Sequence, residues 1–121
     1  MSEESVIEIR PHEQVLLVGV LRRSLDEEAT RCLVDEVLTA AAGKPGVPIV
    51  LDLSEVKFAP SVAIGALVQL SKSFKLDQRR IALIGVQRRV NEVIRVTQLH
   101  HILEIHHTLD QVIDAPPPNA R

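Results

Sequence analysis

Apolar positions along this chain follow two periods, one typical of strands and one typical of helices. Segments near the amino end alternate apolar and polar residues, and two continuous apolar runs follow, as in strands buried on both sides. The expected strands are residues 6–10, 15–21, 47–53, 81–86 and 102–106. The first two predict a hairpin, and each of the others follows a helical segment.

Four segments show helical spacing. Ser24 and Glu27 predict a capping box before the first helix, and Gly43 is expected to stop it. The buried positions of this helix are expected to be Ala29, Leu33, Val37 and Ala40. One face of the third helix should carry Val90, Val93, Ile94 and Thr97. The later helices are expected over residues 61–77, 88–98 and 109–113.

The alternation of strands and helices predicts an α/β fold with right-handed crossovers between parallel strands. We expect a single domain over residues 1–115, with a mixed sheet of about four to five strands packed with about four α-helices. Three consecutive prolines predict that residues 116–121 form an extended, mobile tail.

The stretch from Val47 to Leu70 carries the candidate functional site. A buried strand ends there at Asp52, and a helix is predicted to begin at Ser61 after a short turn. Ser61 is thereby placed at the carboxyl end of a central strand, where open α/β sheets gather functional groups. A phosphate on Ser61 would meet free backbone N–H groups and the positive end of the helix dipole. The alternative is structural, since serine is a preferred N-cap residue.

Gly65 follows Ser61 by one helical turn. A glycine there costs the helix about 1 kcal/mol relative to alanine. We expect close packing of the helix on the sheet to offset this cost, and an opening for a partner is the alternative.

Composition and charge narrow the classes of partner. The chain has 121 residues, 45% of them hydrophobic, but only two aromatic residues, Phe58 and Phe74. With a net charge of −2 it lacks the basic excess and the stacking platforms that nucleic-acid binding uses, so no nucleic-acid partner is expected. Cys32 is the single cysteine, and neither a charged leader nor a membrane-length apolar run is present. We expect a soluble, cytoplasmic protein without direct membrane insertion.

Four histidines near the carboxyl end raise the question of a metal site. If residues 102–106 form a strand, the pairs His100–His101 and His106–His107 stand roughly 16 to 20 Å apart, too far to share one ion. Glu104 shares a strand face with His106, but two ligands rarely suffice. We therefore expect no metal and no cofactor.

Catalysis has little support from local spacing. No base is placed within reach of Ser61, and the spacing of a phosphate-binding glycine loop is absent. We expect no enzymatic activity. A metal-dependent or serine hydrolase is the alternative from the enzyme class.

A series of positions follows the order and spacing of a known family: Val50, Leu51, Asp52, Leu53, Ser54, Phe58, Ser61, Ile64, Gly65 and Leu67. Together with the strand at 81–86 and the segment 97–105, this series resembles the STAS domains, and among them the anti-sigma factor antagonists. The resemblance covers about residues 6–115.

The resemblance implies a regulatory protein-binding domain in signal transduction and transcription. Ser61 lines up with the family's phosphoacceptor, although Pro60, Val62 and Ala63 replace the usual Asp, hydroxyl residue and Gly around it. The implied partner is an anti-sigma factor with serine-kinase character, with a phosphatase as a further partner. The implied partner-binding residues are Phe58, Ala59, Pro60, Ser61, Val62, Ile64 and Gly65.

Two other functions fit the same resemblance. One is a STAS scaffold in a signalling complex that is not phosphorylated, which Val62 and Ala63 favour. The other is a cytoplasmic accessory subunit of a membrane transporter.

Overall fold

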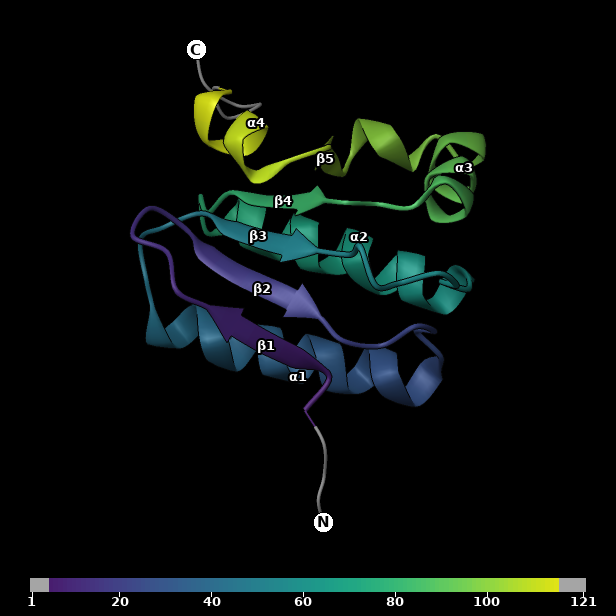
Figure 1. Cartoon of the computed structure of the whole chain (residues 1–121), viewed down its shortest axis with the longest axis horizontal. Helices are drawn as coiled ribbons and strands as arrows, with labels where there is room; N and C mark the ends of the chain where they lie inside the picture. Colours follow the sequence, from purple (N-terminus) through teal and green to yellow (C-terminus); the bar gives the residue numbers. More distant parts are fainter. Residues whose placement is uncertain (1–4, 116–121) are drawn as a thin grey trace.

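Five strands form one sheet in the order β1-β2-β3-β4-β5 in this computed structural model, which describes residues 5–115 (Figure 1). The strands are β1 (Ile7–Arg10), β2 (Leu16–Val20), β3 (Ile49–Asp52), β4 (Ile81–Ile84) and β5 (Glu104–His106). The helices are α1 (Glu27–Gly43), α2 (Ser61–Leu76), α3 (Arg88–Val96), the 3-10 helix η1 (Leu99–His101) and α4 (Leu109–Asp114). The tail predicted for residues 116–121 lies outside the described residues.

The sheet is mixed, as predicted. β1 pairs with β2 antiparallel, which confirms the hairpin, and the remaining neighbours pair in parallel. β3 is therefore the central strand, with β1 and β5 at the two edges. Within residues 5–115, none of the helices is long and apolar enough to cross a membrane.

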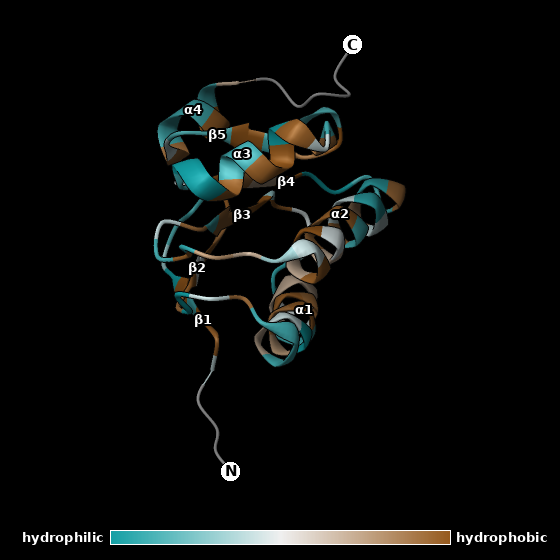
Figure 2. Ribbon diagram, turned by 90° about the vertical axis from the view of Figure 1, so that its right-hand side faces the viewer, coloured by the Kyte–Doolittle hydropathy of each residue, from teal (hydrophilic) through white to brown (hydrophobic). Residues whose placement is uncertain are grey.

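Helices cover both faces of the sheet (Figure 2). The larger core joins one face to α1, α2 and α3, whereas α4 packs on the opposite face in a smaller cluster. Consecutive residues of β3 serve the two cores, because Leu51 belongs to the larger one and Val50 to the smaller one. This confirms the prediction that an unbroken apolar run marks a strand buried on both sides.

The start of α1 differs from the prediction. Asp26, not Ser24, is the N-cap residue, and its side chain accepts a hydrogen bond of 2.8 Å from the Ala29 N–H. Ser24 instead forms an isolated bridge with Phe58. The predicted capping box is therefore wrong, because the chain ahead of Asp26 is held by another loop.

The other helix boundaries differ by small shifts. Gly43 is the last residue of α1, and Ala41 rather than Ala40 is fully buried. α3 stops at Val96, two residues earlier than expected, since Gln98 adopts a left-handed conformation with φ 62°. Two positions predicted for the buried face of α3 are exposed: Val93 and Thr97.

β5 is shorter than expected. Residues 99–101 form a 3-10 turn, so the strand begins only at Glu104 rather than at Ile102. The short helix expected over residues 109–113 is present as α4, where Thr108 and Gln111 form a capping box.

Arg79 ties the end of α1 to the start of β3. Its guanidinium donates hydrogen bonds to the carbonyl oxygens of Ala41, Val47 and Lys44, the first two at 2.7 Å and 2.9 Å. Burial lowers the pKa of Arg79, but no described acid pairs with it. The side chain acts as a clamp on backbone carbonyls at the carboxyl end of α1 and in the loop that leads to β3.

We expect Arg79→Met to lower the free energy of unfolding by about 2 kcal/mol, because hydrogen bonds to a charged group are lost while the aliphatic stem is kept. Urea unfolding measures this loss. The matched control is Lys72→Met on the exposed side of α2, for which less than about 0.5 kcal/mol is expected. Equal losses in the two variants would contradict a clamping role for Arg79.

Candidate functional site

The loop between β3 and α2 is fixed at the carboxyl edge of the sheet. Within this loop Leu53 and Val56 are buried in the main core. Phe58 is held by the loop after β2, since its N–H donates to the Arg23 carbonyl at 3.1 Å and its carbonyl accepts from the Leu25 N–H at 2.9 Å. The segment that leads into α2 is thus a braced loop with a defined shape.

Ser61 is the first residue of α2, and Pro60 is the N-cap. Pro60 makes no side-chain cap, and its carbonyl accepts the N–H groups of Ala63 and Ile64 at 2.9 Å and 3.1 Å. The interpretation of Ser61 as an N-cap is therefore wrong, because the proline already occupies that position. Within residues 5–115 the Ser61 hydroxyl has no hydrogen-bond partner.

An exposed apolar patch surrounds Ser61. Phe58 is 45% exposed and Val62 is 47% exposed, a high fraction for side chains of this type. Pro60, Ser61 and Gly65 are exposed as well, and Ala59 is half-buried. We call these six residues, Phe58, Ala59, Pro60, Ser61, Val62 and Gly65, the α2 face.

Ile64 does not belong to this face. It is only 2% exposed and packs in the main core, so its predicted role as a partner-binding residue is wrong. The physical reason is the helical period, which turns Ile64 towards the sheet while Ser61, Val62 and Gly65 remain outside.

Gly65 lies on open surface. A Cβ built on it would meet no atom within 4 Å, so the expected close packing on the sheet is wrong. Nothing within the described structure offsets the helix cost of this glycine. Its effect is to leave a low, side-chain-free area next to Val62.

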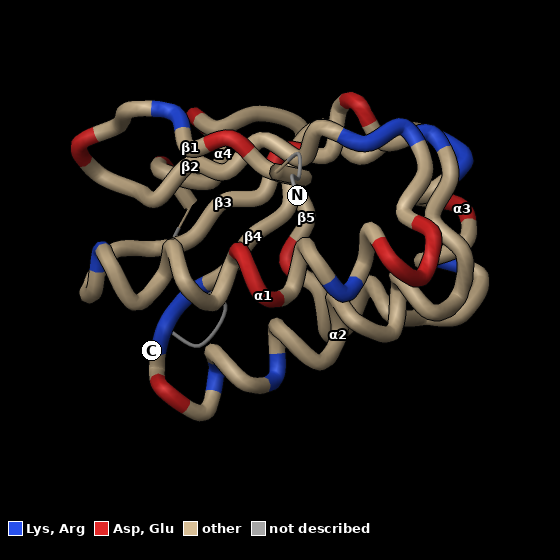
Figure 3. The backbone as a smooth tube through the Cα atoms, turned by 90° about the horizontal axis from the view of Figure 1, so that it is seen from below, with Lys and Arg blue, Asp and Glu red and all other residues tan. Residues whose placement is uncertain are grey.

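Basic side chains border the α2 face, and none of them was among the partner-binding residues predicted from the sequence. Arg89 of α3 lies over the Phe58 ring, with 5.3 Å from its Cζ atom to the ring centroid. Lys57 and Arg23 are exposed on the two loops that brace Phe58. Figure 3 places basic segments beside α3 at this end of the molecule. Each of the three basic residues follows the carboxyl end of a strand in the sequence, and this shared position could have identified them.

Asp52 anchors the start of the loop. Its Oδ2 lies 2.7 Å from Nη1 of Arg10, and its Oδ1 accepts a hydrogen bond of 3.0 Å from the Ser54 N–H. Arg10 reaches it from β1 by crossing β2 above Gly19, where any Cβ would collide with the guanidinium. Burial raises the pKa of Asp52, but the Ser54 hydrogen bonds and Arg10 outweigh it and lower the pKa overall.

The ion pair of Asp52 predicts a stability change in acid. Because the folded-state pKa is lowered, the Ser54 hydrogen bonds and the Arg10 ion pair together contribute fully above about pH 4, and their contribution is lost as the pH falls through the folded-state pKa. We expect Asp52→Asn to flatten the decline in unfolding free energy below about pH 4, as measured by urea unfolding. The control is Asp35→Asn on the exposed side of α1, and an Asp52→Asn profile as steep as that of the wild type would contradict the assignment.

The histidines do not come together as a metal centre. The rings of His100 and His101 lie 4.2 Å apart between centroids, whereas His106 is hydrogen-bonded to Glu104 at 2.9 Å. This bond confirms that Glu104 and His106 share a strand face. Glu104 also accepts hydrogen bonds from both Nε and Nη2 of Arg80. Among the described residues, no three or more His, Cys, Asp or Glu side chains are grouped to hold a metal ion.

Comparison with known proteins yields consistent matches. The family model of the STAS domain matches residues 7–112. The anti-sigma-B factor antagonist of Listeria monocytogenes is 32% identical over 72 residues, which make up 60% of this chain and 63% of the relative. The chain thus aligns with less than two thirds of that relative's length.

Solved structures share the fold. An anti-sigma-factor antagonist (STAS) domain protein from Planctomyces limnophilus superposes with a TM-score of 0.76 at 24% identity, covering 92% of this chain and 97% of that one. The murine Solute Carrier 26 family member A9 anion transporter matches with a TM-score of 0.72 at 19% identity, over 86% of this chain and 18% of the transporter. The match of the family model, which spans nearly the whole described structure, shows that this chain belongs to the STAS domain family.

Proposed function

We propose that this chain is a regulatory binding module that docks on an anti-sigma factor through the α2 face. The observation that carries the proposal is the exposure of Phe58 and Val62 on a braced loop and a helix start, beside the bare surface at Gly65. A solvent-exposed apolar patch with a polar rim is typical of protein-binding sites. The similarity to an anti-sigma-B factor antagonist supports this class of partner.

The charged residues around the α2 face indicate which kind of partner surface can bind there. Arg89, Lys57 and Arg23 border the patch, while the chain as a whole carries a net charge of −2. The border of the docking surface beside Phe58 therefore carries a local cluster of positive charge. It favours a partner that presents acidic side chains around an apolar centre.

Phosphorylation of Ser61 would switch this interaction. The N–H groups of Ser61 and Val62 have no hydrogen-bond partner within residues 5–115, so the helix start can accept a phosphate without loss of structure. A phosphate would add nearly two negative charges in the middle of the docking surface, where they would repel an acidic partner. In this scheme the anti-sigma factor is the serine kinase, a phosphatase reverses the reaction, and the chain acts by binding rather than by catalysis.

The Ser61 switch predicts opposite results for two variants. Ser61→Asp should weaken the complex with the anti-sigma factor at least tenfold, and Ser61→Ala should bind like the wild type but accept no phosphate. Because Pro60 is the N-cap, Ser61→Ala should change the unfolding free energy by less than about 0.5 kcal/mol. Calorimetric titration and peptide mapping after incubation with the kinase and ATP measure these outcomes.

A scaffold without phosphorylation is the second candidate function. Pro60 favours it, because this residue removes both a carboxylate and an N–H next to Ser61. If kinase treatment adds no phosphate and Ser61→Asp binds as tightly as the wild type, the chain is a permanent binder and the switch is excluded.

A further inference from the structure

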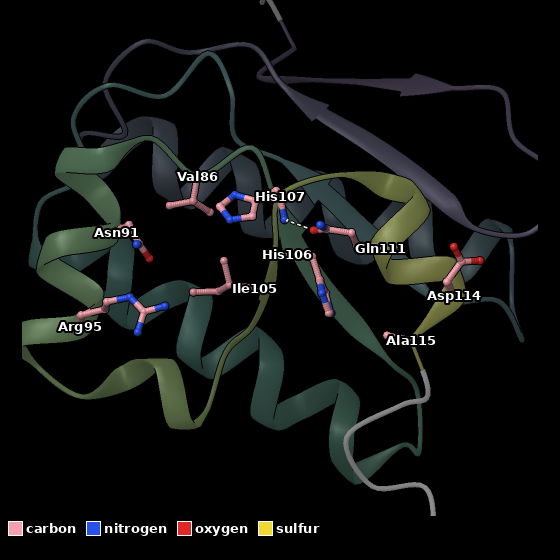
Figure 4. Close-up of a pocket in the computed structure, with 9 residues that line it drawn as sticks. All are labelled: Val86, Asn91, Arg95, Ile105, His106, His107, Gln111, Asp114 and Ala115. Atoms are coloured by element: carbon pink, nitrogen blue, oxygen red, sulfur yellow. Dashed lines mark hydrogen bonds between the residues drawn. The ribbon is translucent and has the colours of Figure 1, made fainter.

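A pocket lies along the outer edge of β5, and its lining residues are separate from those of the α2 face. The pocket holds about 540 Å³ and is open to solvent. Figure 4 shows that β5 runs between its two walls, with Asn91 and Arg95 of α3 on one side and Gln111 and Asp114 of α4 on the other. The floor is therefore the free edge of the sheet.

The hydrogen-bond pattern identifies which backbone groups point into this pocket. The N–H of Ile49 donates to the Arg80 carbonyl, and the N–H of Leu53 donates to the Ile84 carbonyl. The backbone groups of Arg80 and of every second residue after it, up to Ile84, therefore point towards β3. Leu83 then faces β5, with Ile105 as its register partner. In a parallel pair, the residues on either side of Ile105 bond to Leu83, and the N–H and C=O of Ile105 point outward.

Ile105 alone among the outward residues of this edge lacks a partner for its N–H within residues 5–115. The N–H of Leu103 donates to the Leu99 carbonyl at 2.9 Å, and the N–H of His107 donates to Oε1 of Gln111 at 2.7 Å. The strand edge is thus closed at both ends and open in the middle. Such an opening fits a short extended segment, which would pair with one residue of β5.

The walls carry opposite charges. Arg95 is exposed on the α3 wall and Asp114 on the α4 wall, and neither forms an ion pair within the described part of the chain. Asn91 adds a side-chain oxygen that is buried without a hydrogen-bond partner, so its amide can turn towards a ligand without breaking a bond. Val86 and Ile105 supply the apolar part of the pocket.

We propose that this pocket binds an extended peptide segment of a partner protein, which adds to β5 as a sixth strand. Its backbone bonds to the free N–H and C=O of Ile105. Successive side chains of a strand point to opposite faces of the sheet. Two peptide residues separated by an odd number of positions therefore face the two walls, where an acidic side chain would pair with Arg95 and a basic one with Asp114. A second copy of the chain does not match the charge pattern of the two walls, because the acid of its own β5, Glu104, is already paired with Arg80.

Panning a displayed library of random seven-residue segments on the immobilised chain tests the proposal. We expect enrichment of segments with an acidic and a basic residue at odd spacing. Arg95→Glu should reduce their capture at least tenfold. The matched control is Lys72→Glu, which makes the same charge change on the exposed side of α2 and should retain capture.

Amide exchange followed by NMR tests the strand addition itself. Exchange of the Ile105 N–H should be fast in the free chain and at least tenfold slower with a synthetic enriched peptide. Methylation of the peptide nitrogen whose N–H donates to the Ile105 carbonyl should abolish the effect, because it removes one of the two backbone hydrogen bonds to Ile105. The proposal is overturned if no charged pattern is enriched, if Arg95→Glu captures as well as the wild type, or if Ile105 exchange is unaffected. Protection of Ile105 by self-association of the free chain would equally overturn it.

Discussion

Leu51→Ala is expected to lower the free energy of unfolding by about 2 to 5 kcal/mol, the range for a leucine removed from a packed core. Leu51 lies in the central strand with 0% exposure, and the larger core surrounds it on the side of α1 and α2. A cavity there cannot be filled by movement of an edge element, because β2 and β4 flank β3 on both sides. Chemical denaturation measures the loss.

Leu76→Ala is the matched control for this prediction. The side chain of Leu76 is 85% exposed at the end of α2, so its truncation should cost less than about 0.5 kcal/mol. Similar losses for the two leucines would contradict the central position of β3 in the core.

Val62→Glu is expected to weaken binding of the anti-sigma factor at least tenfold, which corresponds to about 1.4 kcal/mol. The variant places a charge in the centre of the α2 face, where burial against the partner would strip it of water. Val62 is 47% exposed in the free chain, so the fold should tolerate the change. Calorimetric titration against an anti-sigma factor purified from the native cell gives the affinity.

The control for Val62→Glu lies on the same helix. Leu76→Glu introduces the same charge at the other end of α2, on a side chain that is 85% exposed. It should bind as the wild type does, and its melting temperature should show that the helix tolerates a glutamate. If both variants bind equally well, the α2 face is not the docking surface.

The sequence predicted the opening hairpin and the two-sided burial of β3 because apolar periodicity reports directly on which positions leave water. It failed at Ser24 and Ser61, where it assigned caps to residues of suitable chemistry. In the structure Asp26 and Pro60 take the N-cap positions, since loops that are distant in sequence hold the chain ahead of each helix. Contacts of that kind leave no local signal.

At the candidate site, too, some features could be predicted from the sequence and others could not. The position of Ser61 at the edge of the sheet could be predicted, because a buried strand followed by a helix defines that edge. The orientation of Gly65 could not, since a helical glycine is compatible with a tight contact and with open surface. The basic border was also missed, because Arg23, Lys57 and Arg89 come from three separate segments that only the fold brings together.

The most direct test of docking through the α2 face is hydrogen–deuterium exchange of the chain, alone and in complex with the anti-sigma factor. Protection is predicted in peptides that cover residues 53–66, the braced loop and the first turns of α2. Peptides from the exposed carboxyl end of α2, residues 72–78, should exchange at the same rate in both states. If residues 53–66 exchange at the same rate in both states and the protected peptides lie on another surface, docking through the α2 face is contradicted.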